Sequence, residues 1–126
     1  KMRVSEIMNK AFAVEEKINL KAAAKIMSDK NIGGLIVMRG EKVCGIIAES
    51  DILKNVSSLG KKVSEVMNKN VIAINKNDSL EDAAEIMAQN KIKRLPVMNK
   101  QELVGIITAT DILAHCDAVD DNFFFD

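Results

Sequence analysis

The stretch GIITATDIL at residues 105–113 is nearly a copy of GIIAESDIL at residues 45–53. Six of the nine letters agree, and the two stretches are 60 residues apart. A glycine and two isoleucines, followed by a polar step and an aspartate before further apolar residues, are typical of a strand that turns into a helix. The chain therefore contains one strand-to-helix corner twice.

The duplication extends over most of the 126 residues. VSEIMNK at 4–10 returns as VSEVMNK at 63–69, and fifteen of 34 positions are identical between 20–53 and 80–113. The first pair of blocks is offset by 59 residues and the second by 60, so one residue is inserted between them, near Asn70. A unit of about 60 residues rarely buries enough apolar surface to be stable alone, so we expect the two copies to pack on each other.

Each copy predicts the element order β-α-β-β-α. Strands are expected at 11–14 and 34–39 in the first copy and at 70–74 and 94–99 in the second, each copy closing with a strand of the type VCGII or LVGII before its corner. The apolar spacing predicts helices over 19–32 and 78–92.

Two local signals refine these elements. A capping box at the second helix would use either Asp78 with Glu81 or Ser79 with Asp82. Pro96 lies inside a predicted strand, which requires an edge position or a place where its missing N–H is tolerated. We expect repeat 1 in residues 1–58, repeat 2 in residues 59–115 and an acidic, phenylalanine-rich tail in residues 116–126.

Composition narrows the classes of function. Apolar residues make up 48% of the chain and charged residues 29%, which is typical of a globular protein. Eighteen basic and eighteen acidic residues cancel, and Tyr and Trp are absent, which argues against nucleic-acid binding. Cys44 in an apolar run and Cys116 near the end are expected to be buried and exposed, so we predict no disulfide and a cytoplasmic protein. No stretch has the roughly 20 apolar residues of a membrane span, and no signal peptide is visible.

The repeated blocks resemble a pair of cystathionine β-synthase (CBS) domains. VSEVM before the unit, IKRLPVM within it and GIITATDIL at its end follow in the family's order, and the likeness covers 4–115. The resemblance implies an α+β fold of two β-α-β-β-α repeats packed through their sheets with pseudo-two-fold symmetry. It also implies a regulatory module, without catalytic activity or a tightly bound cofactor, that binds an adenosine-containing ligand (AMP, ADP, ATP or S-adenosylmethionine) in the cleft between the repeats. It further implies a homodimer and an effector protein whose identity the sequence does not give.

The family's ligand pattern is Gly, two apolar residues, Ser or Thr, two more residues and Asp, and 105–111 matches it completely. By this resemblance Asp111 holds ribose hydroxyls, and Thr108 contacts ribose or phosphate, with Thr110 beside them. The same Thr-x-x-Asp spacing also caps a helix, so capping, binding or both remain open. The first copy keeps Asp51 and has Ser50 for Thr110, but Ala48 lacks the hydroxyl, which predicts a weaker site or one selective for a smaller ligand such as AMP or adenosine.

A second difference between the copies lies just before the middle strand. Lys93 and Arg94 stand there in the second copy, and Gly33 and Gly34 in the first. By resemblance the two cations contact phosphates, and Arg suits bidentate contact; the alternative is a solvated turn. The glycines permit a close backbone approach or an unusual turn.

The resemblance also assigns a base pocket to each aspartate, formed by residues of the other repeat. Ordinary core positions are the alternative interpretation. The pocket of Asp111 would use Ala13, Ile32, Gly33 and Gly34, and that of Asp51 would use Ile72, Ala73, Ile92 and Pro96.

Other functions have weaker support. His115, Cys116, Asp117 and Asp120 lie close together in the sequence but lack usable metal-ligand spacing, so we predict no metal and no catalytic residues. A ligand-free oligomerisation or protein-interaction module is the main alternative. Nucleic-acid binding through Lys91, Lys93 and Arg94 is a third. The tail with its three phenylalanines is either disordered or packed on a surface of this or a neighbouring chain, and packing is favoured because three exposed phenylalanines would promote aggregation.

Overall fold

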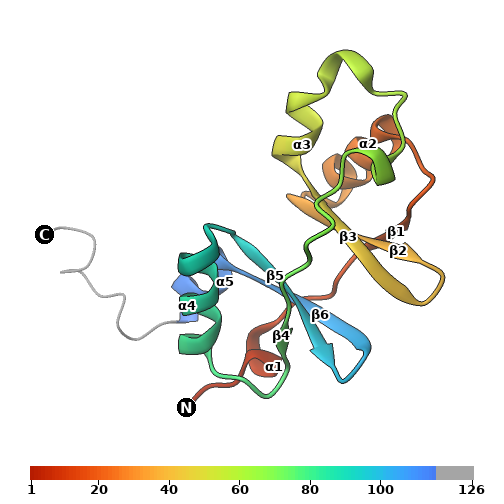
Figure 1. The fold of residues 1–126 in the computed structure, drawn as a ribbon. Helices are drawn as coiled ribbons and strands as arrows, with labels where there is room; N and C mark the ends of the chain where they lie inside the picture. The colour runs from red at the N-terminus through yellow and green to blue at the C-terminus, as the bar shows by residue number, and fades with distance from the viewer. Residues whose placement is uncertain (116–126) are drawn as a thin grey trace, which may run out of the picture. The chain divides into compact units, whose positions relative to one another are not determined.

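The computed structural model describes residues 1–115, which form two compact units (Figure 1). One unit is Phe12–Val71, and the other combines Lys1–Ala11 with the chain from Ile72 onward. Each unit therefore contains the body of one repeat together with the short segment that opens the other repeat. The predicted tail, 116–126, lies outside the described residues.

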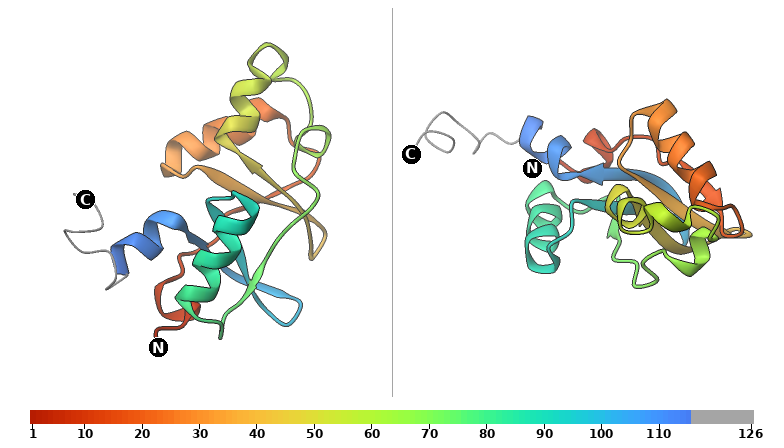
Figure 2. Two further views of the ribbon diagram at one scale, coloured as in Figure 1. Left: turned by 60° about the vertical axis from the view of Figure 1, so that its left-hand side comes forward. Right: turned by 90° about the horizontal axis from the view of Figure 1, so that it is seen from above.

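The unit Phe12–Val71 has a three-stranded sheet in the order β1-β2-β3, with β1 parallel and β3 antiparallel to β2. Helices α2 and α3 lie side by side against this sheet (Figure 2). The elements are β1 (Ala13–Glu15), α2 (Leu20–Lys30), β2 (Gly34–Arg39), β3 (Lys42–Ala48), α3 (Glu49–Lys54) and the short 3-10 turns η1 (Val56–Ser58) and η2 (Val63–Glu65).

The other unit repeats this arrangement, with sheet order β4-β5-β6 and with α4 and α5 packed against it. This confirms the α+β class and the repeated β-α-β-β-α order, while the packing of one sheet on the other stays a prediction. The elements are α1 (Val4–Ile7), β4 (Ile74–Asn75), α4 (Leu80–Asn90), β5 (Arg94–Asn99), β6 (Glu102–Thr108) and α5 (Ala109–His115).

The long helices begin where polar side chains cap them. Ser79 Oγ accepts a hydrogen bond from Asp82 N at 3.1 Å, and Asp82 Oδ2 accepts one from Ser79 N at 3.3 Å. Of the two predicted capping boxes, Ser79 with Asp82 is therefore the one that forms. In α2, Asn19 Oδ1 accepts from Ala22 N at 2.9 Å and takes the same role.

Pro96 lies in β5, the central strand of its sheet, so the expected edge position is wrong and the alternative of a tolerated gap holds. At the matching place in β2, Ile36 N donates to Phe12 O at 3.0 Å. Pro96 has no N–H to make this bond, and the β4 ladder starts only at Ile74 opposite Val97. The strand predicted at 70–74 is consequently reduced to its last residue and Asn75.

The short segments 4–10 and 63–69 dock on their units in the same way. Val4 N donates to Asp78 O, and Val63 N donates to Ile18 O, both at 2.8 Å. Val4 and Val63 are fully buried, each within the apolar core of its unit. Each core is therefore completed by residues from the opening segment of the other repeat.

Gly105 lies where the segment 4–10 crosses β6. A Cβ atom at this position would lie 2.9 Å from Asn9 O and against the Met8 side chain. At Gly45 a Cβ would similarly meet Asn68 O at 3.2 Å. The glycine that opens both corner motifs is thus required by the crossing segment.

We predict that Gly105→Ala lowers the thermal midpoint of unfolding by several degrees, because overpacking at a tight contact costs about 1–3 kcal/mol. Circular dichroism melting measures this shift. Gly60→Ala is the control, since a Cβ there meets nothing within 4 Å. Equal midpoints for the two variants would show that the crossing is looser than described.

Candidate functional site

The corner between β6 and α5 is closed by Thr108 and Asp111. Asp111 Oδ2 accepts hydrogen bonds from Thr108 N at 2.9 Å and from Thr108 Oγ1 at 2.8 Å, while Asp111 N donates to Thr108 Oγ1 at 3.2 Å. Both side chains are half-buried. The capping interpretation of this motif is therefore confirmed, and the question is what the carboxylate can still bind.

Asn9 supplies a third donor to the same carboxylate. Its Nδ2 lies 2.8 Å from Asp111 Oδ2, across 102 positions of sequence. Every hydrogen bond that the Asp111 carboxylate accepts within residues 1–115 ends on Oδ2, so Oδ1 retains its capacity to accept from a ligand hydroxyl. Sequence reasoning missed Asn9; the only signal for it was the repetition of the VSEIMNK block.

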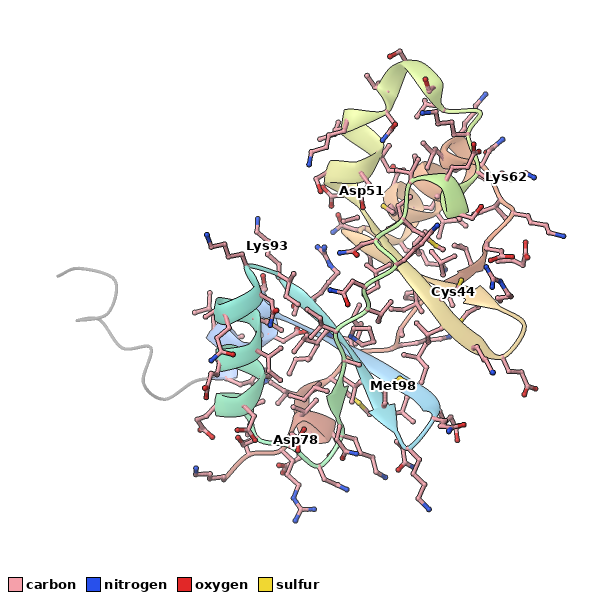
Figure 3. All side chains as sticks on the ribbon, viewed as in Figure 1. Cys44, Asp51, Lys62, Asp78, Lys93 and Met98 are labelled. Carbon is pink, nitrogen blue, oxygen red and sulfur yellow. The ribbon has the colours of Figure 1, made fainter. Side chains whose placement is uncertain are left out.

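Two predicted cations lie at this same end of the sheet. Arg94, half-buried, is the register partner of Thr108, and such partners project from the same face of a sheet. Lys93 is exposed and is labelled in Figure 3. Its carbonyl oxygen accepts a hydrogen bond from Ala109 N at 2.8 Å. The fold thus gathers Thr108, Asp111, Lys93 and Arg94 at one end of one unit. Thr110 is also there, exposed on the first turn of α5.

The corner of the first repeat has the same backbone with fewer functional groups. Asp51 Oδ2 accepts Ala48 N at 2.8 Å, and Gly34 is the register partner of Ala48 (Asp51 is labelled in Figure 3). Glu49 N donates to Gly33 O at 3.0 Å, as Ala109 does to Lys93. This corner therefore lacks the hydroxyl and both cations at equivalent positions.

Beside the first corner, a cavity of about 330 Å³ opens between α2 and α3. This volume is at the lower end of the range for small-molecule pockets. Ile52 is only half-buried here, whereas its counterpart Ile112 lies in the core of the other unit. The cavity is lined by Ala24, Met27, Ser28, Asn31, Ile32, Glu49, Ile52 and Leu53, of which Ile32 belongs to the predicted base pocket.

The remaining base-pocket residues are divided between the units. Within the described residues, Gly40 is the only glycine with a positive φ, 60°, so Gly33 and Gly34 do not form a left-handed turn, and the alternative of a close backbone approach there stays a prediction. The association of each aspartate with the other repeat stays a prediction. Ala13, Ile32, Gly33 and Gly34 lie in the unit of Asp51, and Ile72, Ala73, Ile92 and Pro96 lie in the unit of Asp111.

Cys44 on β3 is half-buried rather than buried, and it lies beside an ion pair. Its Sγ is 3.7 Å from Glu16 Oε2, which accepts Arg39 Nε at 2.9 Å. Burial, followed by the Glu16 carboxylate, raises the pKa of the Cys44 thiol, while Arg39 opposes the shift. The thiol therefore stays protonated at neutral pH and is a weak nucleophile.

Within residues 1–115, no cluster of three or more His, Cys, Asp or Glu is arranged to hold a metal ion. His115 Nδ1 lies 3.0 Å from Asp111 O, one helical turn earlier. Cys116, Asp117 and Asp120, considered with it as metal ligands, lie outside the described residues. In the same part of the chain, no helix has the length and apolar character to span a membrane.

Comparison with known proteins identifies the repeat. The family model described as "CBS domain" matches residues 4–58 and 63–117. "Uncharacterized protein MJ1232" of Methanocaldococcus jannaschii is 36% identical over 107 residues, which cover 84% of this chain and 36% of that protein. "CBS domain-containing protein YhcV" of Bacillus subtilis is 35% identical over 97 residues, covering 74% of this chain and 69% of that protein. The chain thus spans about a third of the first relative.

A solved structure extends the likeness to the fold. The CBS domain pair of protein MJ0100, in complex with 5'-methylthioadenosine and S-adenosyl-L-methionine, matches with a TM-score of 0.84 at 30% identity. The match covers 90% of this chain and 94% of that one. The resemblance found in the sequence is therefore confirmed over nearly the whole chain.

Proposed function

The chain belongs to the CBS-domain family, and from this premise we propose that it is a regulatory module that binds an adenosine-containing ligand at the Asp111 corner. The proposal is carried by the Asp111 carboxylate, which is fixed through Oδ2 and keeps Oδ1 available beside Thr108 and Arg94. The ligands of the MJ0100 domain pair, both of which contain adenosine, support this class of ligand.

The corner favours ligands that carry an anionic group. Asp111 Oδ1 would accept a ribose hydroxyl, since an ionised carboxylate is an acceptor only. Arg94 and Lys93 would pair with a phosphate of AMP, ADP or ATP, or with the carboxylate of S-adenosylmethionine. Adenosine and methylthioadenosine lack such a group and should bind this corner more weakly. The ligand acts by shifting the population of conformations toward those that bind it best.

The Asp51 corner is proposed as a second, weaker site. Ala48, Gly33 and Gly34 leave it without the hydroxyl and the cations of the first site, so it suits a smaller or less charged ligand. The base-pocket contributions assigned to both aspartates by family resemblance belong to this proposal.

Replacing the two aspartates ranks the two sites. Asp111→Ala should reduce the affinity for ATP or S-adenosylmethionine by about 10-fold or more, because a hydrogen bond to a charged group contributes about 1.5–3 kcal/mol. Asp51→Ala should change it much less. Isothermal titration calorimetry of the full chain makes the comparison.

Both aspartates accept the backbone N–H three residues earlier, at 2.8 and 2.9 Å, so both substitutions remove that capping bond. Asp111→Ala also removes the bonds from Thr108 Oγ1 and Asn9 Nδ2, so the thermal midpoint of each variant is measured beside its affinity to show that it is folded. Equal losses of affinity would contradict the ranking of the sites. Folded wild-type protein that gives neither heat nor a raised thermal midpoint with AMP, ADP, ATP or S-adenosylmethionine would contradict the proposed function and favour the ligand-free oligomerisation module.

The homodimer is proposed to form through the second helix of each repeat. Leu53 on α3 and Leu113 on α5 occupy equivalent repeat positions and are 71% and 46% exposed. In this proposal each leucine contributes an apolar side chain to the association surface of the dimer. We also propose that the protein is cytoplasmic and that it acts on an effector protein. Binding of nucleic acid is not part of the proposal.

Leu53→Lys combined with Leu113→Lys should shift the protein from dimer to monomer, because two pairs of charges would be buried on association. Sedimentation velocity measures the change. Ala114→Lys, at the exposed neighbouring position on α5, should leave the dimer intact. A monomeric wild-type protein would overturn the homodimer.

A further inference from the structure

Asn9 reaches the Asp111 corner from a distant part of the sequence. Its backbone is fixed on β6 by two hydrogen bonds, from Asn9 N to Ile106 O at 2.8 Å and from Ile106 N to Asn9 O at 2.9 Å. This bridge puts the Asn9 amide 2.8 Å from Asp111 Oδ2. Resting on the proposed function, we infer that Asn9 is a positioning residue of the ligand site, which holds the Asp111 carboxylate with Oδ1 turned to the ligand.

Three donors on one oxygen define the orientation of the carboxylate. Thr108 N, Thr108 Oγ1 and Asn9 Nδ2 all donate to Oδ2, so turning the carboxylate out of its present plane would weaken or break these three bonds, and only the equivalent half-turn would restore them. Two of these donors belong to the corner itself, and only Asn9 approaches from another segment. A group that is already oriented loses less freedom when the ligand binds, which improves affinity.

The first repeat shows that the amide bond is separate from segment docking. Asn68 is the counterpart of Asn9 and makes the same backbone bridge, with Asn68 N to Ile46 O at 2.8 Å and Ile46 N to Asn68 O at 3.0 Å. The Oδ1 of Asn68, however, accepts a hydrogen bond from Asn70 N at 2.9 Å. The Asp51 carboxylate accepts a hydrogen bond only from Ala48 N among the described residues, and none from Asn68. The equivalent asparagines therefore differ in role: Asn68 stabilises a local turn, and Asn9 contacts the aspartate of the candidate site.

The single-residue insertion between the repeats lies where the two copies differ. It lies near Asn70, whose N–H binds the Asn68 side chain two residues earlier, as in an Asx-turn. The docked backbone is thus preserved in both copies, while only Asn9 is directed to an aspartate.

The contact also links ligand binding to the docking of the segment 4–10. If Asn9 improves ligand affinity, the ligand must by reciprocity strengthen the docking of this segment by the same factor. Occupancy of the corner therefore affects the segment that opens the first repeat.

Calorimetry of the full-length chain with S-adenosylmethionine and with ATP tests the inference. Asn9→Ala should weaken binding about 5-fold, the equivalent of one ordinary hydrogen bond. Asn9→Asp keeps the shape but has no donor and brings a second carboxylate, so it should weaken binding further. Asn9→Gln keeps the NH₂ group and should recover part of the loss.

Asn68→Ala is the matched control, because it truncates the same residue on the same backbone bridge. It should leave the affinity unchanged while shifting the thermal midpoint about as much as Asn9→Ala does. In wild-type protein the ligand should also slow hydrogen exchange at the amides of Asn9 and Ile106, and less so in Asn9→Ala.

The outcomes separate the inference from the function on which it rests. Wild-type binding with equal affinities for Asn9→Ala and Asn68→Ala would overturn the role of Asn9 and leave the ligand site standing. Absence of binding of both probes to the folded wild-type protein would overturn both. Loss of affinity in Asn9→Ala with no recovery in Asn9→Gln and none of the expected further loss in Asn9→Asp would also contradict positioning through the amide donor.

Discussion

The crossing of a short segment over the last strand of each sheet is the constraint on which the structure depends. It requires glycine at positions 45 and 105, because a Cβ there would meet the crossing backbone and a methionine side chain. It also buries Val4 and Val63 in the two cores. Each segment opens one repeat and docks on the body of the other, so the unit that holds the second sheet combines Lys1–Ala11 with the chain from Ile72 onward, while Phe12–Val71 is continuous in sequence. Each repeat therefore needs the opening segment of the other repeat to complete its core.

The two corners show how one repeated scaffold can carry different functional groups. Hydrogen bonding of the backbone is nearly the same in both, and both aspartates cap the following helix. The differences on which the proposed ranking rests lie in side chains: Thr108 against Ala48, Lys93 and Arg94 against Gly33 and Gly34, and the side-chain partner of Asn9 against that of Asn68. The two copies thus share the contacts of the backbone, and in the proposed function the differing side chains set the ligand affinity.

Local pattern predicted most of the elements. The strands at 34–39 and 94–99 have the predicted bounds, and the two long helices lie within their predicted ranges. The strand at 70–74 was the largest error, since the apolar run there is real but Pro96 withholds the bond that would extend the ladder. Pro96 shortens β4 because β4 pairs with β5. The residues of 70–74 alone do not show which strand they will pair with, so this effect could not be predicted from them.

The candidate site was predictable only where its residues are close in sequence. Thr108 and Asp111 form a recognisable spacing, and Lys93 with Arg94 differ visibly from their counterparts. Asn9 had no such signal, because Asn9 and Asn68 stand in almost identical blocks and differ only in what their side chains bind. The repeated sequence also does not show whether the segments 4–10 and 63–69 dock on their own repeat or on the other one.

A titration of ¹⁵N-labelled protein with S-adenosylmethionine, followed by two-dimensional NMR, tests the central claim most directly. The account predicts that the largest shifts fall on the amides of 108–111 and on the side-chain NH₂ of Asn9, at ligand concentrations that leave 48–51 little changed. Shifts that are largest at 48–51, or none anywhere at saturating ligand, would contradict it.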